Sequence, residues 1–194
     1  MKSGRYLHYF DTCIFLHWLS DPQKDVAVVD GIEDIVLSAE RQQSVIIVTS
    51  VITRIEILNA RLAPDASERF NRMLGQFIVQ TVNVDPRIAL LAHDIRDYYM
   101  SQTPAVKLET PDCIHLATAI HFECDEMNTL DGGGLRKRPG DLLTLSENVM
   151  GGKYTIPIKK PLRKSSPSPQ EPPNPPLFRL FDAHTDTKQD DEKT

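Results

Sequence analysis

Four acidic residues are placed where their carboxylates could act together: Asp11, Glu56, Asp112 and Asp131. They are far apart in the chain, yet each falls where a predicted strand ends or a predicted helix begins. In a twisted parallel sheet, such positions converge on one crevice. Two carboxylates about 4 Å apart repel by roughly 4 kcal/mol at an effective dielectric near 20, so a cluster of them requires a compensating cation. Hard carboxylate oxygens favour Mg2+ or Mn2+, and the four acids are therefore the candidate metal ligands.

The elements that would position these acids alternate along the chain from residue 5 to residue 145. Apolar and β-branched runs predict strands at 5–10, 45–48, 77–84 and 126–130, with a possible fifth at 142–145. Apolar residues at helical spacing predict helices at 25–41, 51–58, from 65 onward, at 86–101 and at 111–122. This alternation predicts an α/β fold, a three-layer α/β/α sandwich with a mostly parallel central sheet.

Two of these helices begin with a capping residue followed by proline, at Asp85-Pro86 and Thr110-Pro111. Proline is harmless at the first helical position because the N–H that it lacks would have no partner within the helix. If Thr110 is the cap, Asp112 occupies the second helical position, where exposed backbone N–H groups and the helix dipole favour a negative charge. The carboxylate of Asp112 is thus expected at the same edge of the sheet as that of Asp11.

The domain organisation changes after residue 150. Residues 1–150 are expected to form one folded domain, and residues 151–194 a proline-rich tail. Eight prolines lie between positions 157 and 176, a density that favours an extended, disordered linker without a core of its own. Leu177 to Phe181 interrupts the polarity of that tail, and a short apolar segment on a tether can dock on a partner or on its own domain.

Charge and cysteine content narrow the class of protein. The net charge is −5, with 14 Lys and Arg against 21 Asp and Glu in residues 1–150, and 8 against 6 in the remainder. An acidic domain argues against a strong nonspecific grip on nucleic acid, which requires many cationic contacts. Three cysteines are too few for a disulfide framework and favour a reducing compartment. The sequence shows neither a signal peptide nor an apolar run near the roughly 18 residues of a membrane span, so we expect a cytoplasmic protein without a membrane partner.

The four segments that contain the acids can be compared with the motifs of known protein families. The four segments are Phe10-Asp11-Thr12, Thr53-Arg54-Ile55-Glu56, Pro111-Asp112-Cys113-Ile114-His115-Leu116-Ala117-Thr118-Ala119 and Asn128-Thr129-Leu130-Asp131. In that order and spacing they resemble the PIN-domain family, and especially the VapC-type ribonuclease toxins of prokaryotic toxin–antitoxin pairs. The resemblance covers roughly residues 6–146, and its most specific parts are the segments of Asp112 and of Thr129-x-Asp131. Gly132-Gly133-Gly134 and the tail depart from the pattern of the family.

The resemblance implies an Mg2+- or Mn2+-dependent endoribonuclease that acts as the toxin of a toxin–antitoxin pair. Asp11, Asp112 and Asp131 would be metal ligands, directly or through water, and Glu56 would hold a metal-bound water and accept its proton. Thr129 would support the site. The implied reaction is metal-assisted hydrolysis of RNA phosphodiester bonds. The implied partners are the RNA substrate, an antitoxin protein and, in a homodimer, a second copy of the chain.

A basic run follows the last acid, formed by Arg136, Lys137 and Arg138. An RNA-backbone contact and a solvated loop explain this run equally well. For Gly132 to Gly134, a flexible turn is favoured over a backbone nest that would bind phosphate.

Two histidines permit other chemistry. His115 lies on the same helix face as Asp112, where hydrogen bonding in the core or around the site is favoured over general-base catalysis. His121 and Cys124 are three residues apart, as in some zinc sites, but no second pair with ligand spacing exists in the sequence.

Other functions remain open at this stage. Each acid alone could be a solvated helix cap, although the ordered set of four argues against that. A PIN-like scaffold could bind RNA or a protein without cleaving, and the retention of all four acids and Thr129 weighs against it. A haloacid-dehalogenase-type phosphatase with Asp11 as nucleophile would need another aspartate two residues later, where Cys13 stands. A receiver-like phosphotransfer domain would need paired acids near the first strand and a late lysine, and neither is evident in the sequence. Gly152-Lys153 is not part of a P-loop, because Tyr154 follows it.

Overall fold

The structure is a computed structural model that describes residues 4–19, 25–42, 44–59, 62–134 and 138–163. Its elements, in chain order, are β1 (Tyr6–Phe10), α1 (Thr12–Leu19), α2 (Val26–Arg41), β2 (Val45–Ser50), α3 (Ile52–Asn59), α4 (Pro64–Leu74), β3 (Val79–Val82), α5 (Pro86–Met100), α6 (Thr110–His121), β4 (Glu126–Asn128), the 3-10 helix η1 (Leu142–Leu145) and β5 (Ile158–Lys159). The segment Leu177 to Phe181, noted in the sequence as an apolar stretch, lies outside the described residues.

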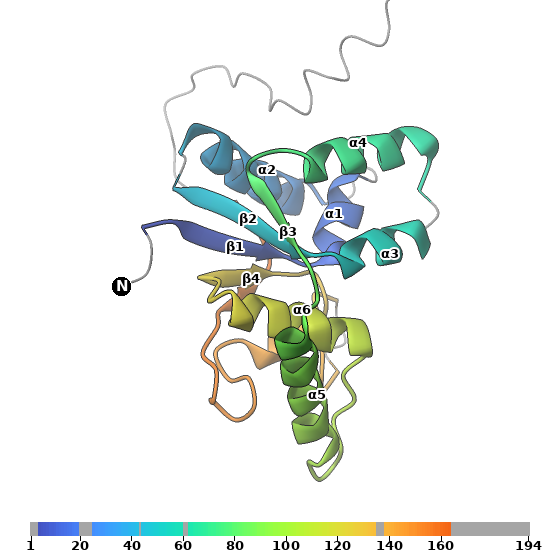
Figure 1. The fold of residues 1–194 in the computed structure, drawn as a ribbon, viewed down its shortest axis with the longest axis vertical. Coiled ribbons are helices and arrows are strands. Elements are labelled where there is room, and N and C mark those ends of the chain that lie inside the picture. The colour runs from blue at the N-terminus through green and yellow to red at the C-terminus, as the bar shows by residue number, and fades with distance from the viewer. Residues whose placement is uncertain (1–3, 20–24, 43, 60–61, 135–137, 164–194) are drawn as a thin grey trace, which may run out of the picture. The chain divides into compact units, whose positions relative to one another are not determined.

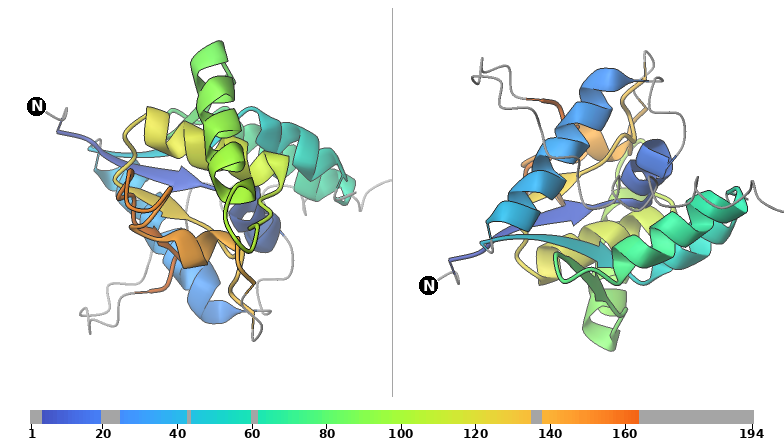
Figure 2. Two further views of the ribbon diagram at one scale, coloured as in Figure 1. Left: turned by 90° about the horizontal axis from the view of Figure 1, so that it is seen from below. Right: turned by 90° about the horizontal axis from the view of Figure 1, so that it is seen from above.

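One parallel sheet organises the described residues, with strands in the order β3-β2-β1-β4-β5. Helix α2 packs on β2 from one side, and α6 packs on β2 and β4 from the other. Figures 1 and 2 show α1 and α2 on one face of the sheet and α5 and α6 on the other. The predicted three-layer α/β/α sandwich with a parallel sheet is confirmed.

The core fills both sides of the sheet, because its central strands are buried on both faces. Five of the six residues of β2 are buried, as expected for a β-branched strand inside a parallel sheet. On one face, Tyr9, Val48 and Met127 pack against α5 and α6. On the other, Phe10 meets Phe15 of α1 in an edge-to-face contact. The end of β1 is therefore packed on both faces, and Asp11 follows it directly.

Helix caps fix several element boundaries as the sequence predicts. The Asp85 carboxylate accepts hydrogen bonds from the N–H groups of Arg87 and Ile88, at 2.8 and 2.9 Å, with Pro86 in the first helical position. Asp25 caps α2 in the same manner through the N–H of Val28. These side chains satisfy backbone donors that a helix start leaves without partners.

The start of α6 differs from the prediction. The helix begins at Thr110, the residue before it is Glu109, and no side chain caps it. The hydroxyl of Thr110 instead accepts a hydrogen bond from Arg96 of α5, at 2.9 Å. Asp112 thus stands one position deeper in the first turn than expected, where the helix dipole still favours its charge. The short helix α1, directly after Asp11, was not predicted.

The fifth strand also differs from the prediction. Residues 142–145 form the 3-10 helix η1, and the fifth strand is β5, which pairs with β4 through Met127 with Ile158 and Asn128 with Lys159. It comes from beyond residue 150, where the sequence placed the end of the folded domain. Ile156 and Ile158 belong to the buried core beside α6. A proline-rich composition suggested a tail here, but pairing with an exposed sheet edge and two buried isoleucines make residues 156–163 part of the folded domain.

Residues 156–163, which we call the C-terminal strap, continue from β5 onto α2. Gly31 of α2 leaves the space for this crossing, because a Cβ atom there would lie 2.1 Å from the carbonyl oxygen of Pro161. Arg163 then pairs with Asp30 and Asp34 of α2, at 3.2 and 3.6 Å. The strap is thus attached to both the sheet and one flanking helix. Among the described helices, none is both long and apolar enough to span a membrane.

Candidate active site

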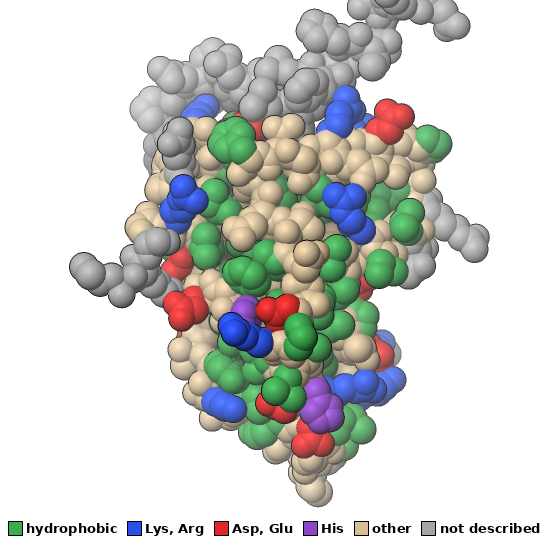
Figure 3. All heavy atoms as spheres, viewed as in Figure 1, with side chains coloured by type: hydrophobic (Ala, Val, Ile, Leu, Met, Phe, Trp, Pro, Cys, Tyr) green, Lys and Arg blue, Asp and Glu red, His purple; other side chains and the backbone are tan. Residues whose placement is uncertain are grey.

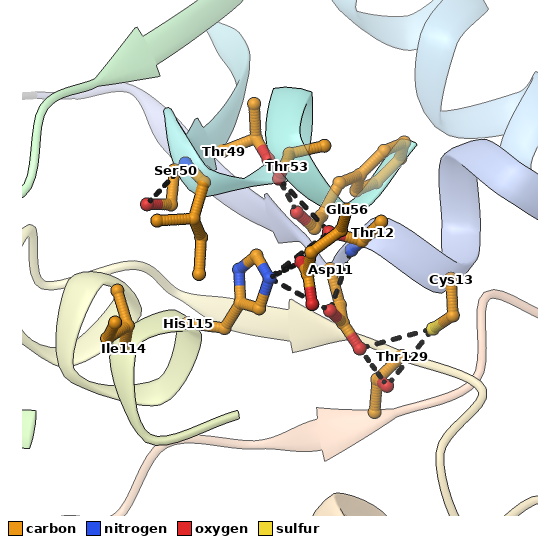
Figure 4. A network of polar contacts seen from close by, with 12 residues as sticks. Asp11, Thr12, Cys13, Thr49, Ser50, Thr53, Glu56, Ile114, His115 and Thr129 are labelled. Atoms are coloured by element: carbon orange, nitrogen blue, oxygen red, sulfur yellow. Dashed lines mark hydrogen bonds and ion pairs between the residues drawn. The ribbon is translucent and has the colours of Figure 1, made fainter. Parts of the chain in front are cut away.

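Asp11 forms the centre of a polar cluster at the carboxyl end of β1. Its backbone N–H donates to the carbonyl of Asn128 at the end of β4, at 3.1 Å, which ties the two strand ends together. The side chain is buried, with 6% of the residue exposed. Oδ1 accepts the backbone N–H of Thr12 at 2.6 Å, and Oδ2 accepts the hydroxyl of Thr129 at 2.7 Å and the thiol of Cys13 at 3.1 Å. The carboxylate of Asp11 is therefore held in one orientation by three donors (Figure 4).

Thr129 connects Asp11 to the last acid of the set. While its hydroxyl donates to Asp11, it also accepts the backbone N–H of Asp131 at 3.1 Å. Asp131 Oδ2 in turn accepts the N–H of Leu142 at 2.8 Å. The first residue of η1 is thus hydrogen-bonded to the Asp131 carboxylate. The Thr129 hydroxyl thus lies between the two predicted acids and contacts both.

Glu56 reaches the same region from α3. Its Oε2 atom accepts a hydrogen bond from the Thr12 hydroxyl and lies 2.8 Å from Nε2 of His115 on α6. Figure 4 shows the imidazole of His115 directed toward both Glu56 and Asp11. The distance from His115 Nε2 to Asp11 Oδ1 is 3.5 Å. Residues from β1, α1, α3 and α6 thus meet at the carboxyl edge of the sheet, as expected for a parallel α/β fold.

His115 is buried and bonded at both ring nitrogens. Nδ1 lies 2.7 Å from the hydroxyl of Tyr9 on β1. Burial and the charge of Asp11 raise the pKa of Tyr9 well above its ordinary value, so the Tyr9 hydroxyl keeps its proton. Because a carboxylate only accepts, Nε2 of His115 carries the proton that faces Glu56. The predicted role of His115 in hydrogen bonding around the site agrees with this geometry.

Electrostatics shows that the acids act on one another. Burial and, after it, the charges of Asp11, Asp131 and Glu56 raise the pKa of Asp112 to about 7, against the opposing effect of His115. The pKa of Asp131 is also raised, first by burial and then by the charges of Asp141 and Asp11. The other three predicted acids therefore all lie within electrostatic reach of Asp112.

The pKa of Glu56 is lowered, in contrast to those of Asp112 and Asp131. Burial alone would raise its pKa, but the hydrogen bonds from His115 and Thr12 and the charge of His115 together lower it below the ordinary value. For His115, burial opposes the charged form, while the hydrogen bond to Glu56 and the charges of Asp11 and Glu56 outweigh it and raise the pKa. The pair is thus stabilised as carboxylate and imidazolium.

The donor chemistry of this site fits a hard divalent cation. Four carboxylates that repel one another gain from a shared cation, and oxygen is the donor that Mg2+ and Mn2+ prefer. In the described part of the chain, however, no three His, Cys, Asp or Glu side chains stand close enough to hold an ion as they are. His121 and Cys124 accordingly form no such group, and the ring of His121 packs edge-on against Phe122.

The predicted RNA-binding residues are described in part. Arg136 and Lys137 lie outside the described residues. Arg138 is exposed, and its backbone N–H donates a hydrogen bond to the Asp141 carboxylate at 2.6 Å. On the face drawn in Figure 3, the described Lys and Arg side chains are scattered and do not gather into one basic patch. This distribution agrees with the acidic composition of residues 1–150.

Several residues of the cluster were missed in the sequence. Thr12 and Cys13 adjoin Asp11, and a hydroxyl and a thiol directly after a strand-end acid are a usable signal. The sequence carries no such signal for Tyr9, because its position in the alternating pattern of β1 is equally typical of core packing. In the structure Tyr9 contacts both the core and the site. The sequence carries no such signal for Lys160 either, since its segment was interpreted as a tail. Its ammonium donates to the carbonyl of Gly133, two residues after Asp131, at 3.0 Å.

Comparisons with known proteins place this geometry in context. A toxin–antitoxin complex from Klebsiella pneumoniae is similar, with 22% identity over 69% of this chain and 93% of that chain and a TM-score of 0.44. VapBC2 from Rickettsia felis, bound to a DNA fragment from its promoter, has 12% identity, coverage of 63% and 86%, and a TM-score of 0.48. VapC20 of Mycobacterium tuberculosis, a toxin that cleaves the sarcin-ricin loop, has 15% identity, coverage of 68% and 98%, and a TM-score of 0.47. No curated protein matches this chain.

These likenesses are distant, and the assignment to a family depends on a separate comparison. The family model of the PIN domain matches residues 8–139. That range contains the carboxyl ends of β1, β2 and β4 and each of the four acids, and it ends before η1 and the C-terminal strap. Because the match spans more than half of the sequence, this chain belongs to the PIN domain family.

Proposed function

We propose that this protein is a divalent-metal-dependent endoribonuclease and the toxin of a toxin–antitoxin pair. PIN-domain proteins of the VapC type are generally nucleases, and nucleases of the family generally depend on divalent metal ions. The observation that carries the proposal is the convergence of the acids at the carboxyl edge of the sheet, where Thr129 links Asp11 to Asp131. Burial and the charges of Asp11, Asp131 and Glu56 together raise the pKa of Asp112 there to about 7. Carboxylates kept together at this electrostatic cost are typical of a site that binds a cation.

Asp11, Asp112, Asp131 and Glu56 would hold the ion, Mg2+ or Mn2+. When bound, such an ion supplies a Lewis acid that makes water a stronger nucleophile and offsets charge on the phosphate. The residues of the chain have distinct tasks around it. Thr129 and the N–H of Thr12 fix the orientation of Asp11, and the N–H of Leu142 fixes Asp131. Glu56, kept ionised by His115, would accept a proton from water.

The proposed partners follow from the same assignment. The substrate is RNA, for which Arg136, Lys137 and Arg138 would contribute contacts to the backbone. The controlling partner is an antitoxin protein, and a second copy of the chain would complete a homodimer. Co-purification with the product of an adjacent small gene, and inhibition of cleavage by it, would test the toxin assignment separately from the enzymatic one.

Cleavage of RNA by the purified protein tests the enzymatic proposal. Single-stranded and structured RNAs are incubated with Mn2+ or Mg2+, and with EDTA as the control. Wild type is compared with Asp112→Asn and with Asp94→Asn, an exposed aspartate of α5 that serves as the matched control. We expect cleavage by wild type and Asp94→Asn with metal, and none by Asp112→Asn. Binding of RNA without metal-dependent cleavage by any variant would establish a scaffold instead.

A further inference from the structure

The C-terminal strap reaches the candidate site from outside the range that the family model matches, which ends at residue 139. Its backbone pairs directly with the strand that leads to the site: the N–H of Met127 donates to Pro157 at 2.8 Å, and the N–H of Thr129 donates to Lys159 at 3.1 Å. The residue that follows this last contact is Lys160. The strap therefore ends its pairing beside the threonine that links Asp11 to Asp131.

Two consecutive lysines of the strap have different partners. Nζ of Lys159 lies 2.5 Å from Oε2 of Glu126, at the amino end of β4. The side chain of Lys159 is about half exposed, at 49%. Lys160 donates to the carbonyl of Gly133 at 3.0 Å. Lys159 is the last residue of β5 and Lys160 follows the strand, and their side chains reach different targets. Lys159 thus attaches the strap to the sheet, and Lys160 contacts the loop after Asp131.

The loop after Asp131 is shaped to receive this lysine. A Cβ atom at Gly133 would lie 2.4 Å from Cε and 2.7 Å from Nζ of Lys160. At Gly132, where φ is +81°, a Cβ atom would lie 2.6 Å from Cβ of Asp141. A Cβ atom at Gly134, in contrast, would meet no atom within 4 Å. Two of the three glycines that depart from the family pattern therefore make room for Asp141 on one side and Lys160 on the other.

We propose that Lys160 is a positioning residue of the candidate active site, which holds the loop 131–134 and thereby the carboxylate of Asp131. This inference deepens the proposed function and rests on it for the link to catalysis. Asp131 is fixed on one side by Thr129 and on the other by the N–H of Leu142. Gly133 adds one local hydrogen bond to Leu130, and the ammonium of Lys160 is the contact that joins this turn to the strap. A charged donor on a half-buried carbonyl makes a stronger hydrogen bond than a neutral donor does.

Backbone hydrogen exchange in the metal-free protein tests the positioning without any assay of activity. Wild type is compared with Lys160→Met, which keeps the apolar stem and removes the donor, and with the neighbouring control Lys159→Met. We expect the amides of Gly133 and Leu142 to exchange about tenfold faster in Lys160→Met, the effect of losing roughly one hydrogen bond. The amide of Met127, which reports pairing of the strap, should keep its wild-type rate. Equal exchange at Gly133 in wild type and Lys160→Met would overturn the proposal.

Glycine variants provide a second route to the same contact. Gly133→Ala should displace the Lys160 side chain and speed exchange at Leu142, while Gly134→Ala, where the added methyl group meets nothing, should not. Because both changes disturb the contact of Lys160, the effects of Gly133→Ala and Lys160→Met should add less than fully in the double variant, although the Cβ at Gly133 would also lie 2.9 Å from the carbonyl oxygen of Leu130. Fully additive effects would show that the glycine and the lysine act independently, against the proposal.

Steady-state cleavage of RNA then separates positioning from substrate binding. We expect Lys160→Met to lower kcat about tenfold with KM little changed, and Lys160→Arg to restore most of kcat by donating to the same carbonyl. A raised KM with unchanged kcat would mean that Lys160 binds RNA and would overturn the positioning role. If wild type cleaves no RNA, the proposed function fails, whereas the exchange rates still decide whether Lys160 holds the loop.

Discussion

His115 on α6 and Glu56 on α3 are joined by a contact of 2.8 Å between Nε2 and Oε2. The same imidazole bonds to the hydroxyl of Tyr9 on β1 through its other nitrogen. One buried ring thus connects the central strand to a carboxylate that is partly exposed, with 28% of its side chain accessible. This connection explains why the pKa of Glu56 is lowered although burial alone would raise it.

Loss of His115 should therefore impair catalysis by releasing Glu56. In His115→Ala, Glu56 loses a charged donor, its pKa rises, and Tyr9 loses its partner. We expect cleavage to fall about 10- to 100-fold, as for other residues that orient the groups of a metal site. Initial rates over a range of pH are the measurement, and the acid limb of the profile should move to higher pH. His93→Ala, an exposed histidine of α5, is the control. An unchanged pH profile in His115→Ala would contradict the role.

Neutralising one of the clustered acids should not harm the metal-free protein. Asp112→Asn removes a charge that burial and the charges of Asp11 and Asp131 disfavour, so the free energy of unfolding in EDTA should be unchanged or higher. Wild type should gain about 2.7 kcal/mol of stability at a metal concentration 100 times its Kd, and the variant should gain far less. Calorimetry in EDTA and in Mn2+ measures both effects. An equal gain for both proteins would argue against a site shared by these acids.

Glu126 should make the fold sensitive to acid at the opposite end of the sheet. Burial would raise its pKa, but His8, Lys159 and Asn128 together lower it below its ordinary value. Because the folded pKa lies below the unfolded one, the stability from Glu126 is present above about pH 4.5 and is lost as the pH falls below it. The midpoint temperature of thermal unfolding should fall more steeply from pH 7 to pH 3 in wild type than in Glu126→Gln. The exposed Glu68→Gln should follow wild type, and a parallel decline in all three proteins would refute the assignment.

Shortening the chain locates the end of the domain. A protein that ends at residue 163 should unfold cooperatively like the full chain, because it keeps β5 and the contacts of Arg163 with α2. A protein that ends at residue 150 loses two buried isoleucines, Ile156 and Ile158, each contributing roughly 1.5 to 3 kcal/mol. We expect its free energy of unfolding to drop by about 3 kcal/mol or more. Equal stability of the two shortened proteins in urea titrations would restore the boundary at residue 150.

The basic run should contribute affinity for RNA and not chemistry. Replacing Arg136, Lys137 and Arg138 with alanine removes three cations and should weaken binding and flatten its dependence on salt. Binding at several salt concentrations, with an uncleavable RNA, provides the measurement. Three exposed arginines elsewhere, Arg41, Arg54 and Arg87, form the matched control. Wild-type binding at low salt in the first variant would assign the run to a solvated loop.

The sequence alone determined the parallel α/β order and the approximate place of each acid. Local physics suffices for this: the β-branched run of β2, the alternation of β1 and the capped start of α5 each select their structure within a few residues. Because parallel strands point the same way, Asp11 and Asp131 had to approach the same edge once the strands were known.

The tertiary structure decided which side chains support those acids and where the domain ends. The network of Tyr9, His115 and Glu56 joins three elements, and neither helical nor strand periodicity specifies such a contact. Residues 156–163 have the composition of a linker, and they become ordered because the free edge of β4 offers backbone partners and α2 offers Asp30 to Arg163. The contact of Lys160 with Gly133 depends on the same pairing. The composition of a segment indicates its conformation in isolation, whereas an unpaired strand edge elsewhere in the fold decides whether the segment becomes part of the sheet.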